Sequence, residues 1–176
     1  AKNAFSKWKE TSKEERINLL EKLLKIYKKR SNELAEAQSM EMGAPIDYAI
    51  SAQTVSGQSH LEDFILRLKN FIDFNLNQSP FNKLKEVGGS IATQANSFDS
   101  SGILLFRQSE STILAFSRRC THAGVAIDAF KDGSARCASH GSEFNLSGEP
   151  TKGPASSKLE QYKVEIINDI IKVSKS

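Results

Sequence analysis

The sequence predicts an α+β protein in which a helical N-terminal hairpin precedes a small all-β domain. Two observations support this fold class. The period of the apolar residues changes near Ser79-Pro80, and the part that follows is interrupted by glycine-containing turns. With 176 residues, 39% of them hydrophobic, the chain is long enough for one ordinary domain or two small ones. We expect a helical module over residues 1–78, a linker at 75–82 and a β-domain over 83–176.

Apolar residues recur at helical spacing in the first part. Residues 11–14 fit a capping box, with Thr11 as the N-cap of the first helix. The Gly-Ala-Pro sequence at 43–45 predicts the end of that helix. A second helix is expected from about Tyr48 to Phe71. The apolar face of the first helix consists of Ile17, Leu20, Leu24, Tyr27, Leu34 and Ala35.

Short apolar runs separated by turns follow Pro80. We expect strands at 103–106, 113–116, 162–167 and 170–173. Asn168-Asp169 predicts a two-residue hairpin turn between the last two strands. Many short strands with Gly-rich loops favour a small antiparallel sandwich or barrel.

Composition excludes several classes of function. The net charge is +3, and positive and negative residues are interspersed. The sequence therefore has no block of basic residues that would indicate nucleic-acid binding. No apolar run approaches the roughly 18 residues of a membrane span. The opening residues 1–3 are not typical of a signal peptide, so a cytoplasmic location is expected. A periplasmic location is the alternative if the natural start is missing, and the first residue is not Met.

Both cysteines and two of the three histidines lie in two short motifs, Cys120-Thr121-His122 and Cys137-Ala138-Ser139-His140. A glycine follows each motif, at Gly124 and Gly141. Two such loops at the tip of a β-domain can face one another and close on a metal centre. The glycines would let backbone N–H groups approach inorganic sulfides closely. A disulfide scaffold would need more cysteines.

Mixed Cys and His ligation has a redox consequence. Replacing two of four thiolates by imidazoles raises the reduction potential of an iron–sulfur centre. The two cysteines would hold the buried iron and the two histidines the outer iron, with exposed imidazole edges as the route for electrons. A structural zinc site is the alternative. Zinc sites usually pair Cys with Cys and His with His, however, and the order here is Cys-His-Cys-His.

The two motifs and their flanks resemble the cluster loops of Rieske [2Fe–2S] proteins. The first loop corresponds to residues 120–124, the second to 137–144, and Gly153-Pro154-Ala155 is similar to the proline-containing third loop. The resemblance covers about residues 84–174. It implies one [2Fe–2S] cluster per chain, with these residues binding or bordering it: Cys120, His122, Cys137 and His140 as ligands, then Ser142, Phe144 and Pro154.

The sequence departs from that family's pattern at identifiable positions. Many relatives tie the two loops with a disulfide, whereas Val125 and Ser139 stand there in this chain. A tyrosine that donates to a ligand sulfur in relatives is replaced by Phe144. Ser142 is retained, and in relatives its hydroxyl bonds a bridging sulfide. The resemblance therefore implies an intermediate potential within the Rieske range of about −150 to +300 mV.

The first part resembles the N-terminal helices of aldehyde dehydrogenases, over residues 1 to about 71. The residues that carry the resemblance are Ala4-Phe5, Trp8, Arg16, Glu33-Leu34-Ala35 and Glu41-Met42-Gly43-Ala44-Pro45. In that family these helices pack on the cofactor domain and hold no catalytic group. The family's nucleophilic cysteine and dinucleotide-binding fold have no counterpart here, so no aldehyde dehydrogenase activity is expected. An unrelated helical hairpin is the alternative interpretation.

The leading hypothesis is a soluble electron-transfer protein or oxidoreductase component that passes one electron to a redox protein or a quinol. The alternative is the iron–sulfur subunit of a quinol-oxidising cytochrome bc-like complex, and a structural zinc module is a further one. A Rieske oxygenase fragment would need a mononuclear iron, usually held by two His and a carboxylate, but no histidine follows His140. Nucleic-acid partners and a membrane span in this chain are not expected.

Overall fold

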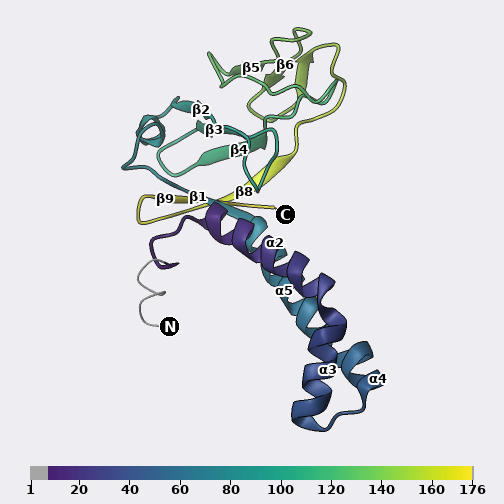
Figure 1. The fold of residues 1–176 in the computed structure, drawn as a ribbon. Helices are drawn as coiled ribbons and strands as arrows, with labels where there is room; N and C mark the ends of the chain where they lie inside the picture. The colour runs from purple at the N-terminus through teal and green to yellow at the C-terminus, as the bar shows by residue number, and fades with distance from the viewer. Residues whose placement is uncertain (1–7, 176) are drawn as a thin grey trace. The chain divides into compact units, whose positions relative to one another are not determined.

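The computed structural model describes residues 8–175, and the chain divides into two compact units, 1–69 and 70–176 (Figure 1). Ala4 and Phe5, which carry part of the resemblance to aldehyde dehydrogenases, lie outside the described residues. Within the described part, no helix is both long and apolar enough to cross a membrane.

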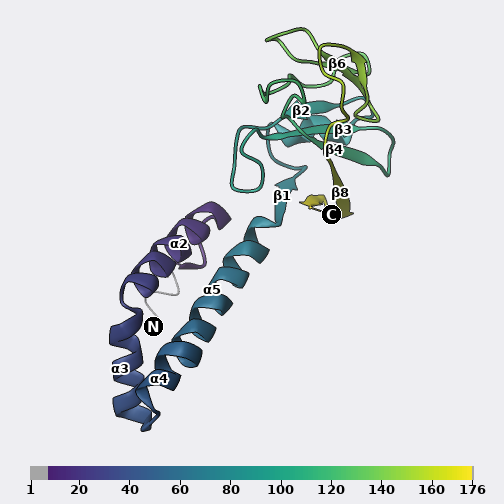
Figure 2. The ribbon, with the colours of Figure 1, turned by 90° about the vertical axis from the view of Figure 1, so that its right-hand side faces the viewer.

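The first unit is a hairpin of helices. Figure 2 shows α2 and α5 side by side along their lengths. Ile17 of α2 and Ile65 of α5 are buried, and the Tyr27 hydroxyl donates to the Thr54 carbonyl at 3.1 Å. The elements are α2 (Lys13–Lys29), α3 (Ser31–Met42), α4 (Ile46–Tyr48), the π-helical segment η1 (Ala49–Gln53) and α5 (Thr54–Lys69).

Helix α2 starts one residue later than predicted. Its N-cap is Ser12, whose hydroxyl accepts from the Glu15 N–H at 3.2 Å, while the Glu15 carboxylate accepts from the Ser12 N–H at 2.7 Å. These hydrogen bonds lower the pKa of the Glu15 carboxyl from its ordinary value. The prediction of Thr11 as the cap was wrong, because its hydroxyl donates to the Trp8 carbonyl at 2.6 Å.

The second unit contains two antiparallel sheets within the described residues. Six strands lie in the order β1-β9-β8-β4-β3-β2, and three lie in the order β5-β6-β7. The 3₁₀ helix η2 (Phe81–Lys85) connects β1 to β2. The strands are β1 (Phe71–Asn75), β2 (Ser90–Ala92), β3 (Ile103–Arg107), β4 (Ile113–Ser117), β5 (Ser134–Arg136), β6 (Glu143–Asn145), β7 (Pro150–Lys152), β8 (Gln161–Ile167) and β9 (Ile170–Ser174).

The four predicted strands are confirmed as β3, β4, β8 and β9. The predicted turn between β8 and β9 is also present, with positive φ of 48° at Asn168 and 62° at Asp169. Such angles suit a type I′ hairpin turn, which matches the natural twist of two antiparallel strands. The three-residue strands β5, β6 and β7 were not predicted, because so short a segment has no readable apolar period.

The predicted helix ends and linker differ from the structure. The first predicted helix breaks at Arg30, which separates α2 from α3. The second ends at Lys69, and Phe71 begins a strand that pairs with β9. Phe74 and Leu76, expected near the linker, are buried in the core of the second unit. The two compact units therefore meet between residues 69 and 70.

Strands β3 and β4 separate two apolar cores. Ile103 and Leu105 of β3 belong to one core, together with residues of β1 and β9. Leu104, between them, points to the opposite side and belongs to a second core, as does Phe116 of β4. Alternate residues of a strand point to opposite faces, so this strand pair is covered on both sides. The second core includes Cys120 and Cys137.

We predict that a fragment starting at residue 70 is more stable than one starting at 83. The shorter fragment loses the buried Phe74 and Leu76 and leaves β9 without its neighbour β1. Removing two large buried side chains is expected to lower the free energy of unfolding by about 4 kcal/mol or more. Urea denaturation of both fragments measures the difference. Equal stability would show that β1 is not part of this fold.

Candidate metal centre

Two loops of the second unit have the same pattern of backbone hydrogen bonds. Loop one (120–125) and loop two (137–142) each begin at a cysteine whose N–H and C=O are both bonded within the loop. The Cys120 carbonyl accepts from the Gly124 N–H at 2.8 Å, and the Cys120 N–H donates to Val125 at 3.0 Å. The equivalent bonds of Cys137, with the residues four and five places later, are both 2.9 Å.

The glycines that close the two loops have left-handed backbone angles. Gly124 has φ of +74° and Gly141 has φ of +78°. An L-residue with a β-carbon rarely adopts this conformation, at a cost of roughly 1–2 kcal/mol. The glycine after each Cys-His motif therefore lets the chain turn back on its cysteine.

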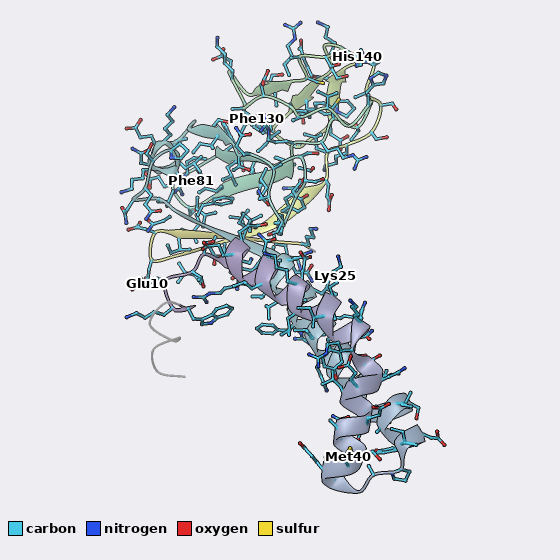
Figure 3. The ribbon with its side chains drawn as sticks, viewed as in Figure 1. Glu10, Lys25, Met40, Phe81, Phe130 and His140 are labelled. Carbon is cyan, nitrogen blue, oxygen red and sulfur yellow. The ribbon has the colours of Figure 1, made fainter. Side chains whose placement is uncertain are left out.

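The cysteines are buried and the histidines are exposed. Cys120 and Cys137 are free thiols with 2% and 0% exposed surface, in the same apolar core. The imidazole rings of His122 and His140 lie edge to face, with centroids 4.8 Å apart. Figure 3 shows His140 at the outer tip of the unit, beyond the core residue Phe130. The structure thus places two inner thiols and two outer imidazoles on facing loops.

Several backbone N–H groups of both loops are not bonded to protein acceptors. Within the described residues, these are the N–H groups of 121–123 in loop one and 138–140 in loop two. Successive N–H groups in a turn can bind an anion together. This donor set, the two thiols and the two imidazoles fit an anionic sulfide-bridged iron centre.

A third loop is tied to both cysteine loops. The buried Ser142 hydroxyl oxygen accepts from the Ala155 N–H at 3.0 Å, and its own proton is left to donate. The Thr121 hydroxyl donates to the Ser157 carbonyl at 2.7 Å. Pro154, the remaining predicted residue of this loop, is exposed. The hydroxyl of Ser142 is therefore positioned between loop two and the third loop.

Phe144 is fully buried on β6. It lies opposite Ala135 of β5, and β5 leads directly into Cys137. The ring belongs to the same core as both cysteines. Its position agrees with a place beside the inner end of the metal centre.

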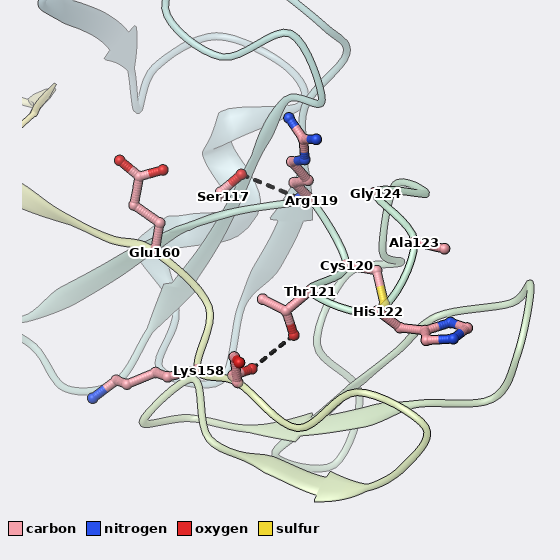
Figure 4. A pocket seen from close by; sticks show the side chains of 10 residues that line it. Ser117, Arg119, Cys120, Thr121, His122, Ala123, Gly124, Lys158 and Glu160 are labelled. Carbon is pink, nitrogen blue, oxygen red and sulfur yellow. Dashed lines mark hydrogen bonds between the residues drawn. The ribbon is translucent and has the colours of Figure 1, made fainter.

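A cavity of about 580 Å³ opens beside loop one (Figure 4). Its lining includes Arg119, His122 and Glu160, so an exposed imidazole borders a polar hollow. The predicted ligand His122 is thus reachable from outside. The full lining is Ser117, Arg119, Cys120, Thr121, His122, Ala123, Gly124, Ser157, Lys158 and Glu160.

Sequence reasoning missed two arginines beside the loops. A β-carbon placed on Gly124 would lie 3.5 Å from Nε of Arg119, and one on Gly141 would lie 4.0 Å from a terminal nitrogen of Arg136. Each guanidinium group therefore lies along its own loop. The signal was present in the sequence, since an arginine directly precedes the cysteine of each motif.

A zinc ion and a two-iron cluster need different arrangements of four ligands. A structural zinc ion needs four ligands at about 2.0–2.3 Å from one centre. A two-iron cluster spreads four ligands over two metals, with two His on one iron and two Cys on the other in a Rieske centre. Two buried cysteines and two exposed histidines on facing loops suit the second arrangement.

Comparison with protein families agrees with this site. Residues 80–163 match the family model of the Rieske [2Fe-2S] domain, and residues 1–78 match that of the aldehyde dehydrogenase family. The second unit, called the β unit from here on, therefore contains a Rieske [2Fe–2S] domain at residues 80–163. Rieske domains bind a [2Fe–2S] cluster, and this domain contains the paired loops for one.

Two curated relatives match different parts of the chain. The cytochrome b6-f complex iron-sulfur subunit of Chlorobaculum thiosulfatiphilum is 29% identical over 107 residues, which cover 55% of this chain and 59% of that protein. The 3-succinoylsemialdehyde-pyridine dehydrogenase of a Pseudomonas species is 38% identical over 61 residues, covering 34% and 13%. The chain thus spans less than two thirds of either relative.

Solved structures similar to this chain include a Rieske protein and a ferredoxin. The plasma membrane Rieske protein of Synechocystis PCC 6803 has a TM-score of 0.40 and 27% identity, over 48% of this chain and 83% of that one. The ferredoxin of carbazole 1,9a-dioxygenase from Nocardioides aromaticivorans IC177 has a TM-score of 0.46 and 21% identity, over 61% and 99%.

We predict that Ser142→Ala destabilises the β unit, because it leaves the Ala155 N–H without its acceptor. An unpaired buried donor costs about 1–3 kcal/mol, which urea denaturation can measure. Ser139→Ala is the matched control, since Ser139 is exposed in the same loop. Equal stability of the two variants would mean that the Ser142 hydroxyl does not hold the third loop.

Proposed function

We propose that this chain transfers single electrons through a [2Fe–2S] cluster held by Cys120, His122, Cys137 and His140. The observation that supports this most strongly is the pair of matching loops, with buried thiols inside and facing imidazoles outside. A bound cluster of this kind supplies a one-electron couple whose potential is raised by the two imidazoles.

Different residues of the chain anchor the centre, provide the route for the electron and donate hydrogen bonds. The two cysteines, both almost fully buried, would anchor the centre in the second core. The exposed rings of His122 and His140 provide the short route by which an electron enters or leaves. The buried Ser142 hydroxyl and the free loop N–H groups are donors that favour the more negative, reduced state.

A redox protein is the first candidate for the partner. The second candidate function is that of the iron–sulfur subunit of a quinol-oxidising complex. The cavity beside His122 favours this second candidate, because a quinol could reach an imidazole there. The similarity to the cytochrome b6-f iron-sulfur subunit supports the same alternative.

The helical unit is not proposed to have dehydrogenase activity. Both cysteines of the chain lie in the loops of the β unit, so residues 1–69 supply no thiol nucleophile. Its similarity to aldehyde dehydrogenases covers 13% of the matched relative.

We predict that the purified protein is red-brown and contains two irons and two acid-labile sulfides per chain, in keeping with a Rieske cluster. Metal analysis and sulfide determination measure this directly. His140→Ala should lose the colour, whereas His60→Ala, in the helical unit, should keep it. Stoichiometric zinc without sulfide would contradict the proposed function.

We predict that Phe144→Tyr raises the reduction potential. The added hydroxyl would lie near the sulfur of Cys137, and a hydrogen bond to a thiolate is stronger in the reduced state. If the differential is on the order of 1 kcal/mol, the potential rises by roughly 40 mV. Voltammetry at one pH measures the shift.

A matched control for this variant is Phe98→Tyr. It adds the same hydroxyl to the first core, which does not include the cysteines, and should leave the potential unchanged. Ser142→Ala should lower the potential, because it removes a donor. A null or downward shift in Phe144→Tyr would show that the ring is not directed toward Cys137.

A further inference from the structure

Two arginines border the exposed imidazoles at the tip of the β unit. Arg119 precedes the cysteine of loop one and Arg136 precedes the cysteine of loop two. We infer, building on the proposed function, that Arg119 and Arg136 form a docking surface for the acidic face of a redox protein. The surface selects among partners, because a neutral quinol would gain nothing from two cationic groups.

The other two arginines of the unit serve the fold. Arg107 is buried and donates to the Leu84 carbonyl at 2.6 Å. Arg118 donates to the Ile127 carbonyl at 2.8 Å. For the guanidinium groups of the two loop arginines, the described part of the chain offers no hydrogen-bond acceptor and no carboxylate within ion-pair distance. These two groups are therefore available to another molecule.

Among the described residues, no carboxylate forms an ion pair with either loop arginine, including Asp128, whose N–H donates to the Arg136 carbonyl at 3.1 Å. Glu143 lies opposite Arg136 across the β5–β6 pair, but its carboxylate is 3.3 Å from the Lys152 ammonium group. Glu149 is 3.5 Å from Lys158 in the same way. Glu143 and Glu149 therefore each form an ion pair with a lysine.

Glu160 lines the cavity together with Arg119. Figure 4 shows the two side chains leaving the backbone at separate points, and no hydrogen bond joins them. The guanidinium group of Arg119 is therefore not tied to this acid.

The location of the arginines suits electron transfer. An electron leaves most easily from the exposed rings of His122 and His140, so a partner must dock against these rings. Guanidinium groups bind carboxylates in a two-pronged geometry, and unpaired charges also speed the encounter with a partner of opposite sign. Carboxylate binding and the faster encounter both act next to the exposed rings, where the route of the electron to a partner is shortest.

Two small oxidants of opposite charge test the surface. The cluster is reduced with dithionite, and stopped-flow absorbance follows the transfer of one electron to hexacyanoferrate(III), a trianion, or to hexaammineruthenium(III), a trication. At about 0.01 M ionic strength, a trianion roughly 10 Å from one cationic group feels an attraction that corresponds to about a fivefold change in rate. Poly-L-glutamate serves as a model of an acidic protein face and competes with hexacyanoferrate(III).

We expect Arg119→Gln and Arg136→Gln each to slow oxidation by hexacyanoferrate(III) about fivefold and to speed oxidation by hexaammineruthenium(III). Poly-L-glutamate should inhibit the parent protein but not the double variant. Arg119→Lys and Arg136→Lys keep the charge and should behave like the parent. Lys163→Gln removes one exposed positive charge on β8, away from the loops, and should change both rates by less than half as much.

The opposite charges of the oxidants separate docking from a change in potential. A lower potential would speed both oxidants, and that outcome would overturn the inference, as would Gln variants no different from Lys163→Gln. A parent protein that cannot be reduced and reoxidised would contradict the proposed function itself. A parent that cycles normally, with variants that do not distinguish the oxidants, would contradict only the docking surface.

Discussion

The metal centre depends on a pair of strands, β3 and β4, that are buried on both faces. One face packs on the core shared with β1, β8 and β9, and the other packs on the core that holds the two cysteines. Leu104 and Phe116 reach into the cysteine core, while their neighbours in each strand reach the other way. These strands are packed on both faces, and loop one follows β4 almost directly.

A gradient of burial across each loop connects the fold to electron transfer. The cysteine lies in the apolar core, the glycine turns the backbone, and the histidine between them emerges at the surface. Cysteine sulfur atoms in this position are buried, whereas the imidazole edges remain exposed to a partner. Both loops show this gradient. The protein alone therefore gives the metal centre an inner side with two cysteines and an outer side with two histidines.

The two units differ in how completely they bury their apolar residues. The β unit has two cores of fully covered side chains. The helical unit buries Ile17, Ala35 and Ile65 but exposes large residues such as Leu23 and Met40. The match to the Rieske [2Fe-2S] domain and all four candidate ligands lie in the β unit.

The fold class and the longer strands could be predicted from the sequence, because both depend on the spacing of apolar residues close together in the chain. The same kind of local spacing predicted four ligand residues and their order. The remaining features depend on contacts between residues that are distant along the chain. Phe71 and Phe74 continue a helical pattern locally, yet pairing with β9 makes them a strand. The strands β5 to β7 are too short for a period, and only their pairing defines them. That Arg119 and Arg136 remain unpaired while Arg118 is bonded internally could be known only once every neighbouring acceptor had its place.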